Sequence, residues 1–236
     1  GEKVALYANK LASNRFIAAI RDAFASTIPI TITAAFFLLI NNVLLTEETG
    51  LLRGIPGRAM ISEICVQAYN GTLGILGLMV TFLIGLRLAR SYDADGALEG
   101  IVALAAYVVL VPNVINVTGT NGKGLEIAGA LTQTYTSASA MLLGIIAALV
   151  SVPLVVKLTN NDRLKIKMPD SVPPAIAKSF NSLIPTVLTI SLFAIVEVGL
   201  RTATGLTIPE IIINILQAPL VGGFQTLPGI LMYVFL

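Results

Sequence analysis

The sequence has no histidine, no tryptophan and one cysteine, and only 12% of its 236 residues are charged. Without histidine, the chain lacks the commonest metal ligand and the usual proton shuttle at neutral pH. The single Cys65 excludes an intramolecular disulfide framework and offers no metal cluster. Soluble domains carry about 25% charged residues, roughly twice the share found here. The composition therefore argues against a metalloenzyme, a disulfide-stabilised protein and a soluble domain, and it points to no cofactor.

Apolar residues are abundant instead. They make up 56% of the chain, and the mean hydropathy is +0.87. Several apolar stretches have about the length that a helix needs to cross a hydrocarbon core of ~30 Å. We expect spans over residues 27–45, 71–89, 98–117, 134–156 and 183–200. The sequence thus predicts an all-α polytopic integral membrane protein with about five transmembrane helices.

Amphipathic and polar segments lie between these spans. Helical spacing of Phe16, Ile20 and Phe24, with charged residues between them, predicts an interfacial helix that leads into the first span. Residues 46–70 are interpreted as a polar connection and residues 118–124 as an exposed turn. The second span is rich in glycine, which favours close helix packing.

Residues 208–224 depart from the spanning pattern. Only ~10–12 apolar residues lie between Pro209 and Pro219, which is too short to cross a bilayer. This length predicts the start of a re-entrant hairpin, and non-helical backbone at that depth is tolerated only against protein or a water-filled cavity. We divide the chain into an amphipathic N-terminal helix (1–26), a transmembrane bundle (27–158), a cytoplasmic linker with an amphipathic helix (159–185), and a fifth span with the first re-entrant segment (186–236).

Basic residues give the expected orientation. With the N-terminus inside, eleven of the 15 Lys and Arg residues fall in cytoplasmic segments and four in outer ones. The positive-inside rule then places the N-terminus in the cytoplasm. Because the basic residues lie in loops and the net charge is only +2, we expect no nucleic-acid partner.

A few polar groups at membrane depth are candidate functional residues. The Arg87 guanidinium suits sugar hydroxyls or a phosphate, or it anchors its span at the interface. The hydroxyls of residues 134–139 could line a sugar path, or they bond their own backbone. Glu197 could be a proton or cation site, but an i,i+4 pair with Arg201 is the simpler expectation.

The most informative stretch is KIKMPDSVPPAIAKSFNSLIP, residues 165–185. Two prolines suit the first turn of a helix, which Asp170 or Ser171 can cap. Pro185 is expected to end that helix by disfavouring helical geometry at Ile184. An apolar stripe on a polar, basic helix is typical of an amphipathic helix at the membrane surface; it comprises Val172, Ile176 and Phe180.

This stretch resembles the signature loop of the IIC membrane components of the lactose/cellobiose/chitobiose branch of the bacterial phosphotransferase system. The pieces INNVLL, LARSYDADG and KLTNNDRLKIK, and the order of the segments, are similar as well. The resemblance covers essentially all of this chain but only about the first half of the family's length. The apolar ending GILMYVFL, which has no cap or polar tail, also leads us to expect a truncated chain.

The resemblance implies a function and partners. A IIC component binds a disaccharide such as cellobiose, chitobiose or lactose in the membrane, and a cytoplasmic IIB partner, supplied by IIA, phosphorylates it on delivery. It further implies a homodimer in the bacterial inner membrane, formed through the first spans and consistent with the glycine-lined second span. The family's sugar-contacting histidine and glutamate are expected beyond Leu236, so no catalytic residue is carried over.

By position, the resemblance assigns substrate contacts to Arg87 and, near the start of the fourth span, to Thr136 or Ser137. The stretch TQTYTSASAMLLG is richer in hydroxyls than the glycine-containing stretch of the family. Two other functions stay open: an ion-coupled secondary transporter, and a non-transporting membrane scaffold or intramembrane enzyme. The absence of histidine leaves the last of these without a common acid–base or metal set.

Overall fold

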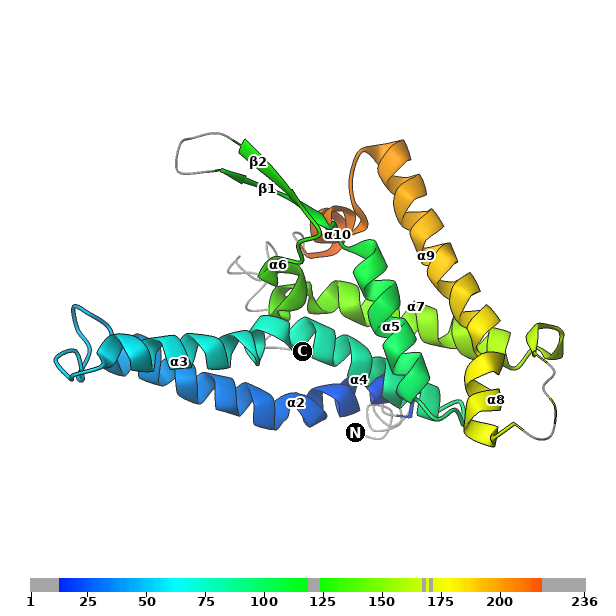
Figure 1. The fold of residues 1–236 in the computed structure, drawn as a ribbon, viewed down its shortest axis with the longest axis horizontal. Coiled ribbons are helices and arrows are strands. Elements are labelled where there is room, and N and C mark those ends of the chain that lie inside the picture. The colour runs from blue at the N-terminus through cyan, green and yellow to red at the C-terminus, as the bar shows by residue number, and fades with distance from the viewer. Residues whose placement is uncertain (1–12, 119–123, 167–168, 170–171, 218–236) are drawn as a thin grey trace, which may run out of the picture.

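The computed structural model describes the chain except residues 1–12, 119–123, 167–168, 170–171 and 218–236. The described chain is helical apart from one two-stranded hairpin (Figure 1). Its main elements are α2 (Arg15–Leu39), α3 (Arg58–Asn70), α4 (Leu76–Arg90), α5 (Ala97–Leu110), β1 (Val114–Thr118), β2 (Gly124–Ala128), α6 (Gln133–Thr136), α7 (Met141–Thr159), α8 (Pro174–Asn181), α9 (Leu183–Thr204) and α10 (Ile208–Ile212).

Helix α2 joins two segments that the sequence analysis separated. It begins where the Asn14 side chain accepts a hydrogen bond from the Phe16 N–H at 2.9 Å, and it runs unbroken past residue 26. It then continues as a π-helical turn, Ile40–Leu44. The predicted interfacial helix and the first span are therefore one helix from residue 15 onward; the start of the predicted interfacial helix lies outside the described residues.

Helix α3 was not predicted. Residues 58–70 were interpreted as part of a polar connection, but they form a helix that packs beside α2 (Figure 1). Ile61, Ile64, Cys65 and Ala68 have the i, i+3, i+4, i+7 spacing of a helix face, and this signal was missed among the polar residues. After a short 3-10 turn, the chain continues into α4, the second predicted span.

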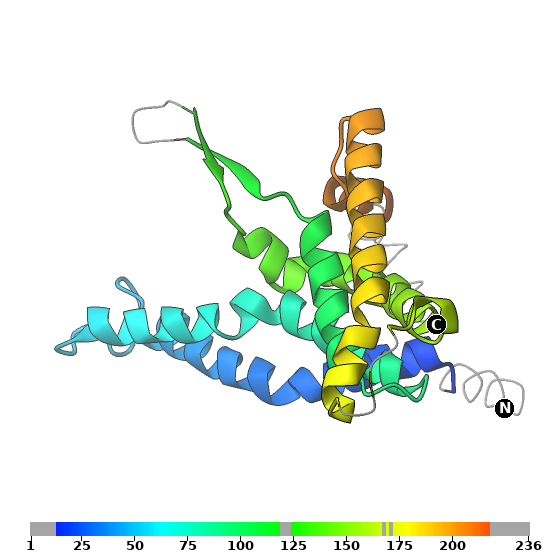
Figure 2. The same cartoon turned by 45° about the vertical axis from the view of Figure 1, so that its right-hand side comes forward.

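Helix α5 is shorter than predicted. We expected the third span to reach residue 117, but the helix ends at Leu110, and Val111 is extended before Pro112. A residue before proline is pushed away from helical geometry, and the β-branched residues that follow suit a strand. Strands β1 and β2 pair antiparallel from Val114↔Ala128 to Thr118↔Gly124 and form an extended hairpin (Figure 2). Residues 119–123 of the expected turn lie outside the described residues.

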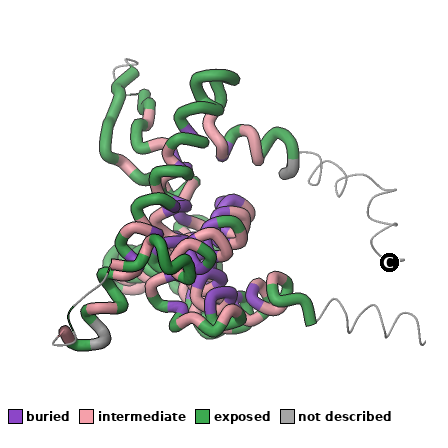
Figure 3. Tube along the Cα trace, turned by 90° about the vertical axis from the view of Figure 1, so that its right-hand side faces the viewer, coloured by how far each residue is buried: buried purple, intermediate pink, exposed green. Residues whose placement is uncertain are grey.

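The core lies where α4, α5 and α7 pack together with the start of α2. Figure 3 shows the buried residues concentrated in this bundle, while the hairpin and much of α9 are exposed. Glycines allow the close packing that the sequence predicted. A Cβ on Gly85 would lie 2.8 Å from the Ala103 Cβ on α5, so this helix pair requires glycine there.

The proline-rich segment forms α8, followed at once by α9. Helix α8 begins at Pro174, so the predicted proline start is confirmed, while the predicted caps Asp170 and Ser171 lie outside the described residues. Pro185 does not end the helix as expected. The break falls at Ser182, and Ile184 is helical because Pro185 occupies the first turn of α9, where a missing N–H costs nothing. Lys178 on α8 pairs with Asp95 of the α4–α5 loop at 3.1 Å.

Four segments within the described residues are long and apolar enough to cross a membrane: Arg15–Leu44, Arg58–Arg90, Ala138–Thr159 and Ile176–Thr204. Helix α5, with 14 residues, is a shorter apolar helix. After α9 the chain reverses at Leu206–Thr207 into α10 and a π-helical turn, Ile213–Gln217. The second arm of the expected re-entrant hairpin lies outside the described residues.

Candidate functional site

The hydroxyl-rich segment expected to start the fourth span is broken rather than continuous. Helix α6 ends at Thr136, Ser137 is extended (ψ −174°), and a 3-10 turn, Ala138–Ala140, precedes α7. The Ser and Thr hydroxyls of this segment can bond nearby backbone groups. These hydrogen bonds compete with those that would continue a regular helix. The Ser139 hydroxyl, for example, donates to the Thr134 carbonyl at 3.1 Å.

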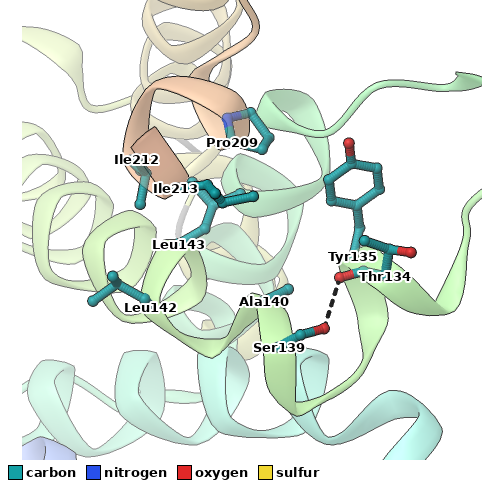
Figure 4. Close-up of a pocket in the computed structure, with 9 residues that line it drawn as sticks. All are labelled: Thr134, Tyr135, Ser139, Ala140, Leu142, Leu143, Pro209, Ile212 and Ile213. Carbon is teal, nitrogen blue, oxygen red and sulfur yellow. Dashed lines mark hydrogen bonds between the residues drawn. The ribbon is translucent and has the colours of Figure 1, made fainter. Parts of the chain in front are cut away.

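This break faces α10 across a small cavity (Figure 4). Polar groups of Thr134, Tyr135 and Ser139 lie on one side, and apolar side chains of α10 and α7 close the other. The lining residues are Thr134, Tyr135, Ser139, Ala140, Leu142, Leu143, Pro209, Ile212 and Ile213. The cavity volume is about 70 Å³, against roughly 300 Å³ or more for a typical ligand pocket. The residues that line this cavity therefore form a small, partly polar wall, and the enclosed space is too small for a ligand of that size.

Tyr135 is the largest polar residue of this wall. Its carbonyl accepts a hydrogen bond from the Tyr107 hydroxyl on α5, which fixes the backbone of α6 against the bundle. Burial, and then the nearby negative charge of Glu210, raise the pKa of the Tyr135 phenol above its usual value of 10.0. The phenol therefore stays protonated at neutral pH and can both donate and accept a hydrogen bond.

Two predicted substrate contacts, Thr136 and Ser137, adjoin this wall without lining the cavity. The buried Thr136 hydroxyl donates to the Gly74 carbonyl at 2.5 Å. The Ser137 hydroxyl lies 3.0 Å from the Ser139 hydroxyl. In this structure Thr136 ties α6 to the 3-10 turn Leu73–Ile75 that precedes α4. Ser137 is linked to Ser139, which does line the cavity.

Arg87 lies elsewhere. Its Nη2 donates to the Ser26 hydroxyl on α2 at 3.0 Å, and its buried Nε has no hydrogen-bond partner among the described residues. Gly77, which contacts the carbonyls of residues 136 and 137, is ten residues away on the same helix, or about 15 Å at 1.5 Å per residue. The structure thus does not bring Arg87 together with the hydroxyl-rich break.

The expected ion pair between Glu197 and Arg201 is not formed. Among the described residues, Glu197 instead accepts a hydrogen bond from the Ile208 backbone N–H at 3.2 Å, because the chain reverses after α9 and brings α10 back against the span. No group of three or more His, Cys, Asp or Glu side chains in the described part of the chain could hold a metal ion.

The hydroxyl-rich stretch 134–139 was predicted from the sequence as a possible lining of a sugar path, and Thr134, Tyr135 and Ser139 of that stretch line the cavity. The α10 residues that line it were not predicted as contacts. The start of α10 also carries a local signal, since Thr207 and Glu210 have the spacing of a capping box and form one. What the sequence could not show is that these two segments face each other.

Comparison with known proteins identifies relatives over nearly the whole chain. The family described as "Phosphotransferase system, EIIC" matches residues 21–236. The oligo-beta-mannoside-specific EIIC component of Bacillus subtilis (strain 168) is 31% identical over 97% of this chain and 50% of its own length. The cellobiose-specific EIIC component of Geobacillus stearothermophilus is 28% identical over 78% of this chain and 41% of its own.

A solved structure shows the same fold. The transporter ChbC, the IIC component from the N,N'-diacetylchitobiose-specific phosphotransferase system, superposes with a TM-score of 0.82. It is 24% identical in sequence, and the match covers 98% of this chain and 53% of that one. The chain spans about half the length of the curated relatives it matches. With a family match from residue 21 to residue 236, this chain belongs to the EIIC family of the phosphotransferase system.

Proposed function

We propose that this chain is the first part of a sugar-translocating permease subunit that carries a β-linked disaccharide, such as cellobiose, chitobiose or lactose. Family membership supports the transport role. The relatives' names support the sugar class, since they include oligo-beta-mannoside-, cellobiose- and lactose-specific components.

The observation that carries this proposal at the level of residues is the helix break that faces α10. A disaccharide needs several hydrogen-bonding groups held at fixed positions in an otherwise apolar membrane. Thr134, Tyr135 and Ser139 place such groups at the cavity. The Ser139 hydroxyl donates to the Thr134 carbonyl, but its oxygen can still accept a hydrogen bond. An aromatic ring at the same wall adds an apolar surface for a sugar face. Thr136, Ser137 and Arg87 remain proposed sugar contacts. Thr136 and Ser137 adjoin the residues that line the cavity.

Phosphorylation would be the work of cytoplasmic partners. We place the chain in the bacterial inner membrane with the N-terminus in the cytoplasm, as the basic residues indicate. The start of α2, the α4–α5 loop and α8 then lie on the cytoplasmic side, where a IIB component, supplied by IIA, would receive the sugar. In this proposal no residue of the chain is catalytic.

We also propose a homodimer through the first span, as the resemblance implies, but without the glycines of the second span. The glycines of the second predicted span are used inside the chain: Gly74 in the 3-10 turn before α4, and Gly77 and Gly85 in α4, are buried, so they do not form a free packing face. An exposed apolar stripe instead follows α2 and its π-helical turn, and α3 adds to it beside α2. The stripe comprises Ile28, Ile32, Phe36, Leu39 and Val43, with Met60 and Ile64 from α3.

Sugar binding by the complete protein in detergent or nanodiscs tests the function. We expect saturable binding of at least one of cellobiose, diacetylchitobiose and lactose by titration calorimetry. Tyr135→Phe should weaken that binding about fivefold to tenfold, as loss of one hydrogen bond of about 1 kcal/mol predicts. Tyr69→Phe, on α3 and not among the residues that line the cavity, is the matched control. Failure of all three sugars to bind would reject the substrate class.

A further inference from the structure

Glu197 is a buried carboxyl inside a membrane span. It lies on α9, only 7% exposed, on a helix whose neighbouring residues are apolar. Ionisable residues at such positions are costly and call for a specific partner. Arg201, four residues on, does not supply one.

The partner of Glu197 is the first residue of α10. Its Oε2 accepts the Ile208 N–H at 3.2 Å, one of the N–H groups that a helix start leaves without an intrahelical acceptor. The next residue, Pro209, has no N–H, and the Thr207 N–H donates to Glu210 at 2.7 Å. The start of α10 is therefore held by two carboxyls: one of its own, and one from the span.

The position of α10 matters because it forms a wall of the candidate sugar site. Pro209, Ile212 and Ile213 line the cavity opposite Tyr135 (Figure 4). Apolar contacts between α10 and the bundle are not directional, so they leave its rotation and axial position less defined. The hydrogen bond from Glu197 is directional, and it connects this wall to a helix that crosses the membrane.

We propose that Glu197 is a positioning residue that fixes α10 against the α9 span and thereby sets the geometry of the sugar site; this inference rests on the proposed sugar-binding function. What the role requires is a hydrogen-bond acceptor at this point rather than a negative charge. Glutamine supplies an acceptor of the same length. Its NH₂ group can be accommodated, because Glu197 also lines an open cavity of about 370 Å³ between α5 and α9 that contains the polar side chains of Asn113 and Arg201.

Three substitutions in the complete protein separate the roles. Glu197→Gln keeps the acceptor, Glu197→Met keeps the approximate length without a strong acceptor, and Glu197→Ala removes both. Thr202→Ala is the control, because Thr202 is exposed on the same helix and its hydroxyl bonds only the Val198 carbonyl among the described residues. Each variant is first checked for a monodisperse, folded state.

Two measurements are made on each variant: hydrogen exchange of the Ile208 amide, and the Kd for the sugar that the wild type binds. We expect the Met and Ala variants to exchange this amide about fivefold faster and to bind sugar about fivefold more weakly. The Gln variant and the Thr202→Ala control should stay within about twofold of wild type in both. These fold-changes are what loss of one hydrogen bond of about 1 kcal/mol predicts.

The outcomes are distinguishable. Unchanged exchange and Kd in both Met and Ala would overturn the positioning role. A Gln variant as impaired as Met would overturn it too, because the charge rather than the acceptor would then be needed. A wild type that binds no disaccharide would reject the proposed function, while the exchange data would still report whether Glu197 holds α10.

Discussion

Gly77 is the residue on which the placement of the candidate site depends most directly. A Cβ there would lie 2.6 Å from the Ser137 carbonyl oxygen and 2.9 Å from that of Thr136. Both atoms belong to the backbone at the helix break, which cannot move aside as a flexible side chain can. Glycine at this point lets α4 support the break from behind, opposite the cavity.

We therefore expect Gly77→Ala to lower the free energy of unfolding by about 1–3 kcal/mol, the range for overpacking a tight contact. Thermal unfolding of the protein in detergent measures this change. Gly71→Ala is the matched control, since the nearest atom to a Cβ there is 3.7 Å away. Equal midpoints for the two variants would contradict the close contact.

At this scale the sequence predicted some roles and not others. It indicated that glycines of the second span permit close packing, and Gly77 and Gly85 do so. The sequence did not show that Gly77 and Gly85 pack against helices of the same chain. Glycine spacing does not tell whether the neighbouring helix belongs to the same chain or to a second copy. Thr136 was predicted near the site and lies there, but its hydroxyl bonds the Gly74 carbonyl, a partner 62 residues away that no local pattern reveals.

Among the elements, the short helix α10 depends for its stability on the hydrogen bonds at its N-terminus. Thr207 and Glu210 form a capping box in which Glu210 accepts from the Thr207 N–H and hydroxyl at 2.7 and 2.8 Å. These hydrogen bonds lower the pKa of Glu210 below its usual value of 4.5. Because the pKa of Glu210 is lower in the folded state, its ionised carboxyl stabilises the protein at a pH above the unfolded-state pKa. This stabilisation is lost as the pH falls through the folded-state pKa.

Glu210→Ala should therefore lower the thermal midpoint at neutral pH, because the variant lacks the cap. The gap between variant and wild type should close as the pH falls well below 4.5, where the wild-type carboxyl is protonated. Midpoints measured across this pH range provide the test. A gap that does not change with pH would show that the ionised carboxyl contributes nothing to the cap.

The elements also show why periodicity alone misplaced boundaries. Apolar, β-branched residues after Pro112 continued the hydropathy of the third span, so the sequence predicted helix where β1 forms. In α3 the reverse occurred, because charged residues masked a helical apolar face. The sequence predicted a helix end at Pro185, but proline is also favourable in the first turn of a helix, and Pro185 lies in the first turn of α9.

For the whole molecule, hydropathy predicted the membrane class and the approximate spans. It could not predict that α6 and α10 lie on opposite sides of one cavity, because that arrangement depends on long-range packing. The exposed stripe on α2 and α3 is the surface through which we propose that two copies meet.

Thiol cross-linking in membranes tests the dimer, in a Cys65→Ala background. We expect Ile32→Cys and Phe36→Cys to give a covalent dimer with a short bifunctional reagent. Ile195→Cys on α9 should not, although its 68% exposure is similar to the 64% and 61% of the other two. Cross-linking at Ile195 alone, or equally at all three positions, would contradict the proposed interface.

The central claim is that the complete protein moves a disaccharide whose uptake is coupled to phosphorylation by cytoplasmic partners. The most direct measurement follows labelled sugar into right-side-out membrane vesicles, with and without the phosphoryl relay inside them. We predict that sugar phosphate accumulates only when the relay and its phosphoryl donor are present. Accumulation of unmodified sugar under an ion gradient, without the relay, would contradict the account and favour an ion-coupled transporter.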